Sequence, residues 1–134
     1  MCAVLLAGAS IQAQQGNKTS SPEDAAVYIV SPANGAVVPI TFTVIFGLTG
    51  MGVAPAGIVK QGTGHHHLLV DGVVMPDLDM PLGAVVTHFG GGQTQTILTL
   101  PPGEHTLQLI LGDHMHIPHE PPVISQVISI IVAN

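Results

Sequence analysis

The chain has 134 residues, of which 46% are hydrophobic and 7% are charged, and its formal net charge at pH 7 is −6. This length makes one domain with enough apolar side chains to bury a core without disulfide bonds. Two lysines and no arginine cannot build a basic patch, so we expect no nucleic-acid partner. The apolar runs all fall short of the roughly 20 residues that a membrane-spanning helix needs, so we expect no membrane span.

Residues 1–13 are mostly small and apolar, and they give way abruptly to a polar stretch. They resemble the second half of a secretory signal peptide, although no basic residue precedes the apolar part. We therefore expect an exported protein, periplasmic or secreted, with residues 14–26 as a polar linker. The single cysteine, Cys2, lies in this leader, so the mature protein would contain none, which suits an oxidising compartment. An apolar N-terminus without a targeting role is the alternative.

Residues 27–134 have the pattern of one all-β domain, because short runs of β-branched residues alternate with glycine and proline turns. No window keeps a helical period of about 3.6 residues. The pattern therefore predicts an immunoglobulin-like antiparallel β-sandwich, and the likeness is one of architecture only, since tryptophan and paired cysteines are absent. The predicted strands are residues 27–30, 40–46, 65–71, 95–100, 105–111 and 124–132.

The connection between the strands at 95–100 and 105–111 bears on function. The turn Pro101-Pro102-Gly103 predicts that these two strands form a hairpin, which would place His88 beside residues 113–116. If the strand at 65–71 also runs antiparallel to 105–111, its first residues join the same end of the molecule. Three segments rich in histidine then converge, while Asp71, Glu104 and His105 gather at the opposite end.

Histidine is the residue type that dominates the possible chemistry of this chain. Seven of the eight histidines lie in the three segments, which are residues 65–67, His88 and residues 113–119. Imidazole is the commonest protein ligand for metals. Within a strand, His65 and His67 share one face and His66 the other. The candidate metal ligands are His65, His67, His88, His114, His116 and His119, of which we expect three or four to bind. His66, Asp113 and Met115 are expected as further ligands or as groups that orient them.

Copper is the predicted metal and zinc the alternative, because imidazole nitrogen suits both ions and no carboxylate-rich calcium loop is visible. Met115, between two histidines, offers a thioether that favours Cu(I). The loop residues Met51, Met75 and Met80 offer more of them, but loop methionines more often fill gaps in packing.

Four ordered motifs resemble a known bacterial family of exported domains, DUF4399, over residues 27–132. The resemblance implies an exported, single-domain β protein, and it implies no reaction and no ligand. The motifs are Gly64-His65-His66-His67-Leu68-Leu69-Val70-Asp71, His88-Phe89-Gly90-Gly91-Gly92-Gln93-Thr94, Leu100-Pro101-Pro102-Gly103-Glu104-His105-Thr106-Leu107-Gln108-Leu109 and Asp113-His114-Met115-His116-Ile117-Pro118-His119.

Two classes of function remain open. The first is an exported protein that stores, delivers or sequesters copper through the histidine cluster. The second is a structural β module without metal, whose histidines form a hydrogen-bonded end cap and whose strand edges assemble with further copies. An enzyme is the least favoured class, because the sequence shows no nucleophile motif, phosphate loop or paired catalytic carboxylates.

Overall fold

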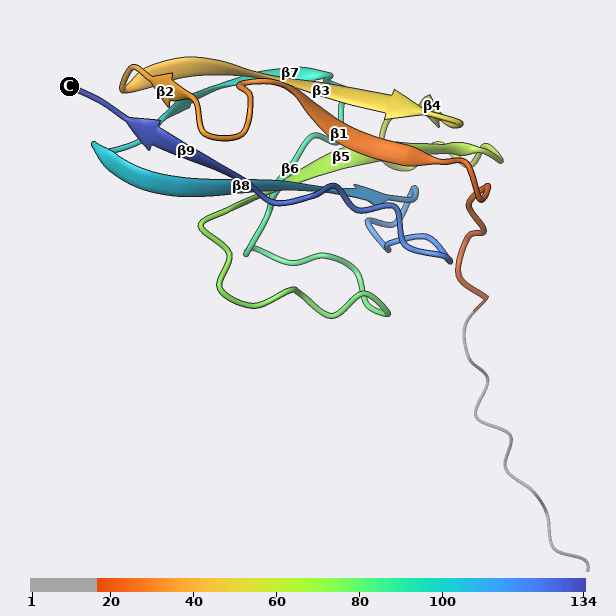
Figure 1. Ribbon diagram of the computed structural model, residues 1–134. Coiled ribbons are helices and arrows are strands. Elements are labelled where there is room, and N and C mark those ends of the chain that lie inside the picture. The colour runs from red at the N-terminus through yellow and green to blue at the C-terminus, as the bar shows by residue number, and fades with distance from the viewer. Residues whose placement is uncertain (1–16) are drawn as a thin grey trace, which may run out of the picture.

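Two β-sheets packed face to face form the body of the protein in the computed structural model, which describes residues 17–134 (Figure 1). The predicted leader at 1–13 therefore lies outside the described residues. The strands are β1 (Ala26–Ser31), β2 (Val37–Val38), β3 (Thr41–Thr49), β4 (Gly52–Val53), β5 (Thr63–Val70), β6 (Thr87–His88), β7 (Gln95–Thr99), β8 (Gly103–Gly112) and β9 (Ile128–Val132). One sheet has the order β1-β3-β7, and the other has the order β2-β9-β8-β5-β4, with β6 paired to β5.

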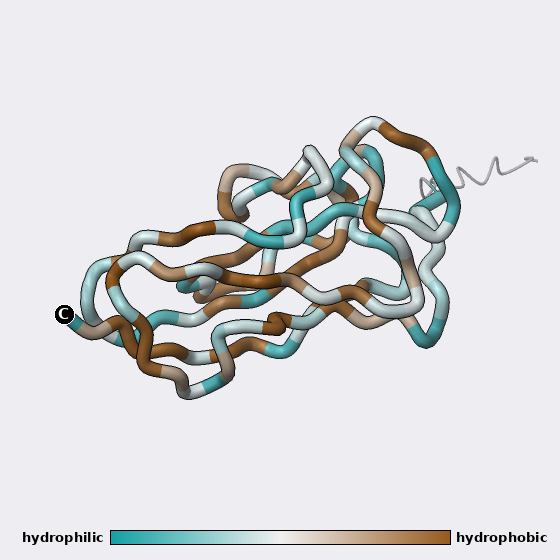
Figure 2. Tube along the Cα trace, turned by 90° about the horizontal axis from the view of Figure 1, so that it is seen from above, coloured by the Kyte–Doolittle hydropathy of each residue, from teal (hydrophilic) through white to brown (hydrophobic). Residues whose placement is uncertain are grey.

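The prediction of an all-β sandwich is confirmed. Residues 17–134 contain no helix, and hence none long and apolar enough to cross a membrane. Alternation builds the core: in β3, Phe42, Val44 and Phe46 are buried, while Thr41 and Thr43 are exposed. Hydrophobic stretches run along the strands in the middle of the body, and many turns at its ends are hydrophilic (Figure 2).

The predicted hairpin is wrong. Strand β7 pairs with β3, whereas β8 pairs with β5 and β9, so the turn after β7 carries the chain from one sheet to the other. Pro101 and Pro102 have no N–H group for a ladder, which suits a connection that leaves the sheet. Because the chain still reverses direction there, the end of β8 and the segment before β7 meet at one end of the molecule, as the hairpin would also have required.

The last strand is shorter than the predicted 124–132. Strand β9 begins at Ile128, while Ile124 makes only an isolated bridge with Ile110. The Ser125 hydroxyl explains the interruption, since it accepts a hydrogen bond from the Leu109 amide at 2.8 Å and donates one to the Gln126 carbonyl. Side-chain bonds of this kind compete with a regular ladder.

Strand β5 is buried on both faces, which positions the candidate site. Its inner face packs into the sandwich, where Leu68 joins the main core. Its outer face is covered by residues 71–86, here called the roof loop, whose Leu82 and Val86 pack on Leu69 and Ile110. In Figure 1 this loop lies below the sheet that contains β5 and β8.

Candidate metal centre

The two faces of β5 divide its three histidines. His65, His66 and His67 are each at most 1% exposed. Side chains alternate along a strand, so His65 and His67 lie on the outer face with Leu69, and His66 lies on the inner face. His66 packs there against Phe46, with ring centroids 5.1 Å apart. The strand therefore offers two imidazoles to the outer face and one to the core.

His116 is the point at which the outer imidazoles meet. Its Nδ1 lies 2.9 Å from His65 Nε2, 3.0 Å from His67 Nε2 and 3.1 Å from His88 Nδ1. A ring nitrogen carries either one hydrogen or one lone pair in the ring plane, so it can make only one good hydrogen bond. Three contacts of hydrogen-bond length to one nitrogen are thus more than hydrogen bonding alone can explain.

The spacing of these nitrogens is one that a single metal ion could bridge. Copper and zinc bind imidazole nitrogen at about 2.0–2.1 Å, so neighbouring nitrogens of a tetrahedral site lie roughly 3.3 Å apart. The ligand atoms of His65, His67 and His116 all lie within 4.8 Å of one another. His88 is not part of this group of three, but its contact with His116 places it beside the same point. Modest outward shifts of these rings would accommodate one ion.

The far nitrogens of these rings differ in their partners. The Nδ1 atoms of His65 and His67 are buried and make no well-formed hydrogen bond within residues 17–134. The Ile110 backbone acts on the His67 ring, but only as the smallest of the contributions to its pKa. His88 Nε2 lies 2.9 Å from the Gly83 carbonyl, to which it donates. This bond puts the hydrogen on Nε2 and leaves the lone pair on Nδ1, the atom that faces His116.

Burial favours the neutral forms of His65, His67 and His116. Desolvation, with a further contribution from the neighbouring imidazoles, lowers the pKa of His65 to about 4 and the pKa of His67 to about 3. Burial and the neighbouring His88 also lower the pKa of His116. Metal binding requires unprotonated imidazole, so at pH 7 these rings have the lone pairs that an ion needs.

Asp113 shapes the loop that presents His116. Its Oδ1 accepts hydrogen bonds from the amides of Met115 and Ile117, at 2.8 and 3.1 Å, and its Oδ2 accepts one from the Thr19 hydroxyl at 2.7 Å. Burial alone would raise the pKa of Asp113, but these three donors hold it below its ordinary value. The turn leaves His116 at a φ of 65°, in the left-handed region where histidine is more frequent than most residues.

Gly112 makes room for the site, although the sequence alone did not indicate this role. It pairs with His65 across β5 and β8. A Cβ atom at this position would lie 2.5 Å from His67 Cε1 and 3.3 Å from the His116 carbonyl carbon. Only glycine allows the His67 ring and the His116 backbone to approach the strand so closely. The feature of the sequence that could have indicated this role is the position of Gly112, directly before Asp113 at the end of a β-rich run.

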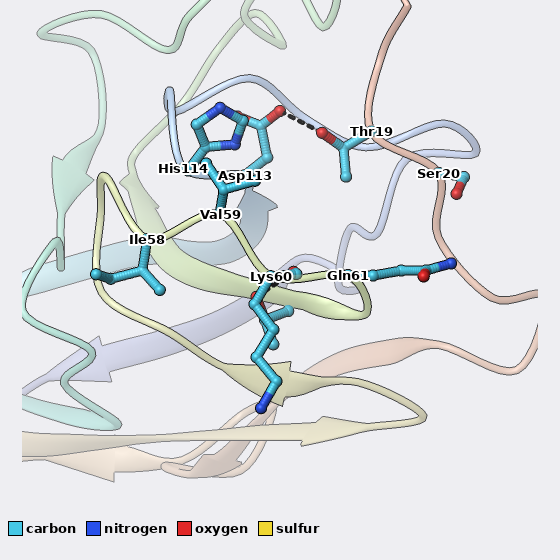
Figure 3. Close-up of a pocket in the computed structure, with 9 residues that line it drawn as sticks. Thr19, Ser20, Ile58, Val59, Lys60, Gln61, Asp113 and His114 are labelled. Carbon is cyan, nitrogen blue, oxygen red and sulfur yellow. Dashed lines mark hydrogen bonds between the residues drawn. The ribbon is translucent and has the colours of Figure 1, made fainter.

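Three predicted ligands lie away from the cluster. His114 lines a pocket with Asp113 and residues 58–61, and in Figure 3 the Lys60 side chain points away from the His114 ring. His119 is fully buried, and its Nε2 lies 3.1 Å from the Thr63 carbonyl. His66 packs in the core, as described above. The structure thus brings together His65, His67, His88 and His116 of the predicted set.

Met115, predicted as a further ligand, is 56% exposed, and its amide bonds to Asp113. Asp113 itself acts through the backbone of the loop: its two oxygens are engaged by Thr19 and by two amides. This carboxylate orients the loop that carries His116.

The opposite end of the molecule holds the remaining histidine. His105 Nδ1 lies 2.7 Å from Asp71 Oδ2, and its Nε2 lies 2.7 Å from the Pro101 carbonyl. The bond to Asp71 is the main reason why the pKa of His105 is raised. Both nitrogens donate, so this ring has no lone pair for a metal ion. Its role is structural, because it connects Asp71 to the turn at Pro101.

A β-sandwich that carries buried imidazoles at metal-ligand spacing defines the general class of protein: a histidine-rich all-β domain with a candidate metal centre. The sequence matches the family DUF4399, described as a domain of unknown function, over residues 44–133. The chain belongs to this family, as the four motifs predicted. Comparisons with curated proteins and with solved structures found no match.

Proposed function

We propose that the protein binds one transition-metal ion through His65 Nε2, His67 Nε2 and His116 Nδ1, with His88 Nδ1 as a fourth ligand. The observation that carries the proposal is the approach of three imidazole nitrogens to His116 Nδ1, at 2.9 to 3.1 Å. A hydrogen-bonded end cap would pair each nitrogen with a separate partner. Here two buried Nδ1 atoms make no well-formed hydrogen bond in the described part of the chain.

Copper is the proposed ion and zinc the alternative. An all-imidazole donor set suits both ions, and copper binds nitrogen ligands more tightly than zinc does. The exposed thioether of Met115, in the loop that carries His116, would add a soft donor for Cu(I) at the surface. The protein would store, deliver or sequester the ion, since His65 and His67 are buried while His88 is exposed. The exposed ligand gives an entering or leaving ion a route to solvent.

Export is part of the same proposal. The apolar segment at 1–13 supports it, because it resembles the second half of a secretory signal peptide. A domain without cysteine also suits a periplasmic or secreted copper carrier, since no thiol is present there for copper to oxidise.

Titration of metal-free protein tests the proposed function. Isothermal calorimetry with Cu(II) and with Zn(II), and electron paramagnetic resonance of the copper sample, should give one ion per chain with nitrogen ligands. The matched control is His116→Gly, which removes the ligand and suits the positive φ of this position. Equal binding by the parent protein and His116→Gly, or no binding by either, would contradict the proposal.

A self-associating β module is the second candidate, favoured by the outer face of the smaller sheet. Strands β1, β3 and β7 contain no charged residue, and Tyr28, Val30 and Ile97 on them are 44%, 54% and 69% exposed. Sedimentation velocity over a range of concentrations tests this candidate. A concentration-independent monomer would end it, and Ile97→Lys should dissociate any assembly that depends on this face.

A further inference from the structure

Residues 18–21, here called the strap, lie before the first strand of the sandwich and reach across the metal-binding end. Their backbone runs beside Glu120, which follows the loop of residues 113–119. The Glu120 amide donates to the Thr19 carbonyl at 2.9 Å, and the Ser21 amide donates to the Glu120 carbonyl at 3.0 Å. The strap is therefore held in place by main-chain bonds, which do not depend on its side chains.

One strap side chain contacts the turn that presents His116. The Thr19 hydroxyl donates to Asp113 Oδ2 at 2.7 Å, while Asp113 Oδ1 accepts the amides of Met115 and Ile117. The Asp113 carbonyl also accepts the His116 amide at 2.9 Å. A single carboxylate thus connects the strap to the residues on both sides of His116.

A second strap side chain holds the roof loop. Lys18 Nζ donates to the Leu78 carbonyl at 2.8 Å and pairs with Asp79 Oδ1 at 3.0 Å. The same loop contacts the site farther along, since the Leu82 amide donates to the His116 carbonyl at 2.9 Å. The strap therefore contacts both of the loops that enclose the cluster.

We propose that the strap positions His116 for the metal ion, with Thr19 and Asp113 as positioning residues and Thr19 as the one whose loss weakens metal binding without removing a ligand. The inference rests on the proposed function and deepens it. It assigns a role to a segment that precedes the sandwich: any change that lifts residues 18–21 from the domain would lower the affinity of the centre. Groups that orient metal ligands typically change metal affinity by about 10- to 100-fold.

The test compares Thr19→Val with Thr19→Ser. Valine keeps the shape of the side chain and the main-chain bonds of the strap, but it cannot donate to Asp113; serine retains the hydroxyl. We expect Thr19→Val to bind Cu(II) about 10-fold more weakly than the parent and Thr19→Ser to bind within about 3-fold of it. In metal-free protein, amide hydrogen exchange of Met115 and Ile117 should be faster in Thr19→Val only.

Two outcomes would overturn the inference. One is parent-like exchange of the Met115 and Ile117 amides in Thr19→Val; the other is parent-like copper affinity despite faster exchange. Failure of the proposed function looks different, because the parent protein itself would then bind no copper. If the parent protein and Thr19→Val bind copper equally well, only the positioning role of the strap is rejected and the proposed metal site stands.

Discussion

The two ends of the molecule use histidine in opposite ways. At one end, both nitrogens of His105 donate to protein oxygens, and the pKa of the ring is raised by Asp71. At the other end, His65, His67 and His88 direct nitrogens at one atom of His116, and burial lowers the pKa values of His65 and His67. Burial of a histidine is therefore not in itself an argument for a metal site. The stronger argument is a set of ring nitrogens that face one another and lack well-formed hydrogen bonds on their far sides.

The largest expected effect on copper affinity comes from replacing His116, and His114 in the same loop provides the comparison. His116→Gly removes the atom on which the cluster converges and should weaken copper binding by more than about 100-fold, beyond the usual effect of an orienting group. His114→Ala, in the same loop, should leave affinity within about 3-fold. The free energy of unfolding of His116→Gly should stay within about 1 kcal/mol of the parent, because relief of the positive φ offsets the flexibility of glycine. Calorimetric titration and urea unfolding measure both quantities, and equal losses of affinity in the two variants would contradict the assignment.

Gly112→Ala should give the next largest effect. The added Cβ would lie 2.5 Å from His67 Cε1, so the ring must shift away from its place in the cluster. We expect copper affinity to fall by about 10-fold or more and stability to fall by about 1–3 kcal/mol, the usual range for overpacking. Gly52→Ala is the matched control, since its Cβ would meet only Thr63 Cγ2 at 3.7 Å. A Gly112→Ala protein that binds and unfolds like the control would show that His67 has more room than the structure gives it.

The two ends should also respond to pH in opposite directions in metal-free protein. The folded pKa values of His65 and His67, about 4 and about 3, lie below the ordinary 6.5, so the unfolded chain binds more protons in that window. Stability should therefore fall as the pH drops below about 6.5. The raised pKa of His105 acts the other way: its contribution is complete below pH 6.5 and is lost as the pH rises through the folded value.

Urea unfolding between pH 4 and pH 9 separates these two contributions. Asp71→Asn keeps a side chain that tolerates the positive φ of this position but removes the charge that faces His105. The variant should lose the decline above pH 6.5 and keep the decline below it. A parent protein whose stability is flat below pH 6.5 would mean that the histidine cluster is not desolvated.

The smallest effect is expected in the core. His66 packs against Phe46, and neither of its nitrogens makes a well-formed hydrogen bond among the residues that the structure describes. The backbone of Gln93 and Gly47 lies near enough to act on the ring, but burial outweighs it and lowers the pKa of His66. Replacement by leucine, of similar volume, removes two unsatisfied polar atoms and should stabilise the protein by about 1 kcal/mol. Thermal unfolding measures this gain, and copper affinity should not change. A destabilised His66→Leu would indicate that a water molecule or a protein group satisfies the ring.

Much of the fold was predictable from local patterns. Alternation in residues 40–46 predicted the buried face of β3, and the period of two correctly separated His65 and His67 from His66. The pairing of β7 was not predictable, because the turn at Pro101 and Pro102 is compatible with either a hairpin or a crossing between sheets. Which sheet receives a strand depends on packing across the whole body, and short runs do not encode it.

The candidate site was only partly predictable for a related reason. In an extended chain after β8, His114 and His116 would lie on the same side, but Asp113 folds the segment into a turn with His116 at a positive φ. The turn separates the two side chains, so that His114 lines a different pocket. The contributions of Gly112 and Thr19 depend on contacts between distant segments, which sequence spacing does not show.

The most direct measurement is a crystal structure of the copper-loaded protein with anomalous scattering at the copper edge. We expect one strong peak per chain at about 2.0–2.1 Å from His65 Nε2, His67 Nε2 and His116 Nδ1. A peak beside His114 or His119, or copper-soaked crystals without a peak at the cluster, would contradict the proposed metal centre.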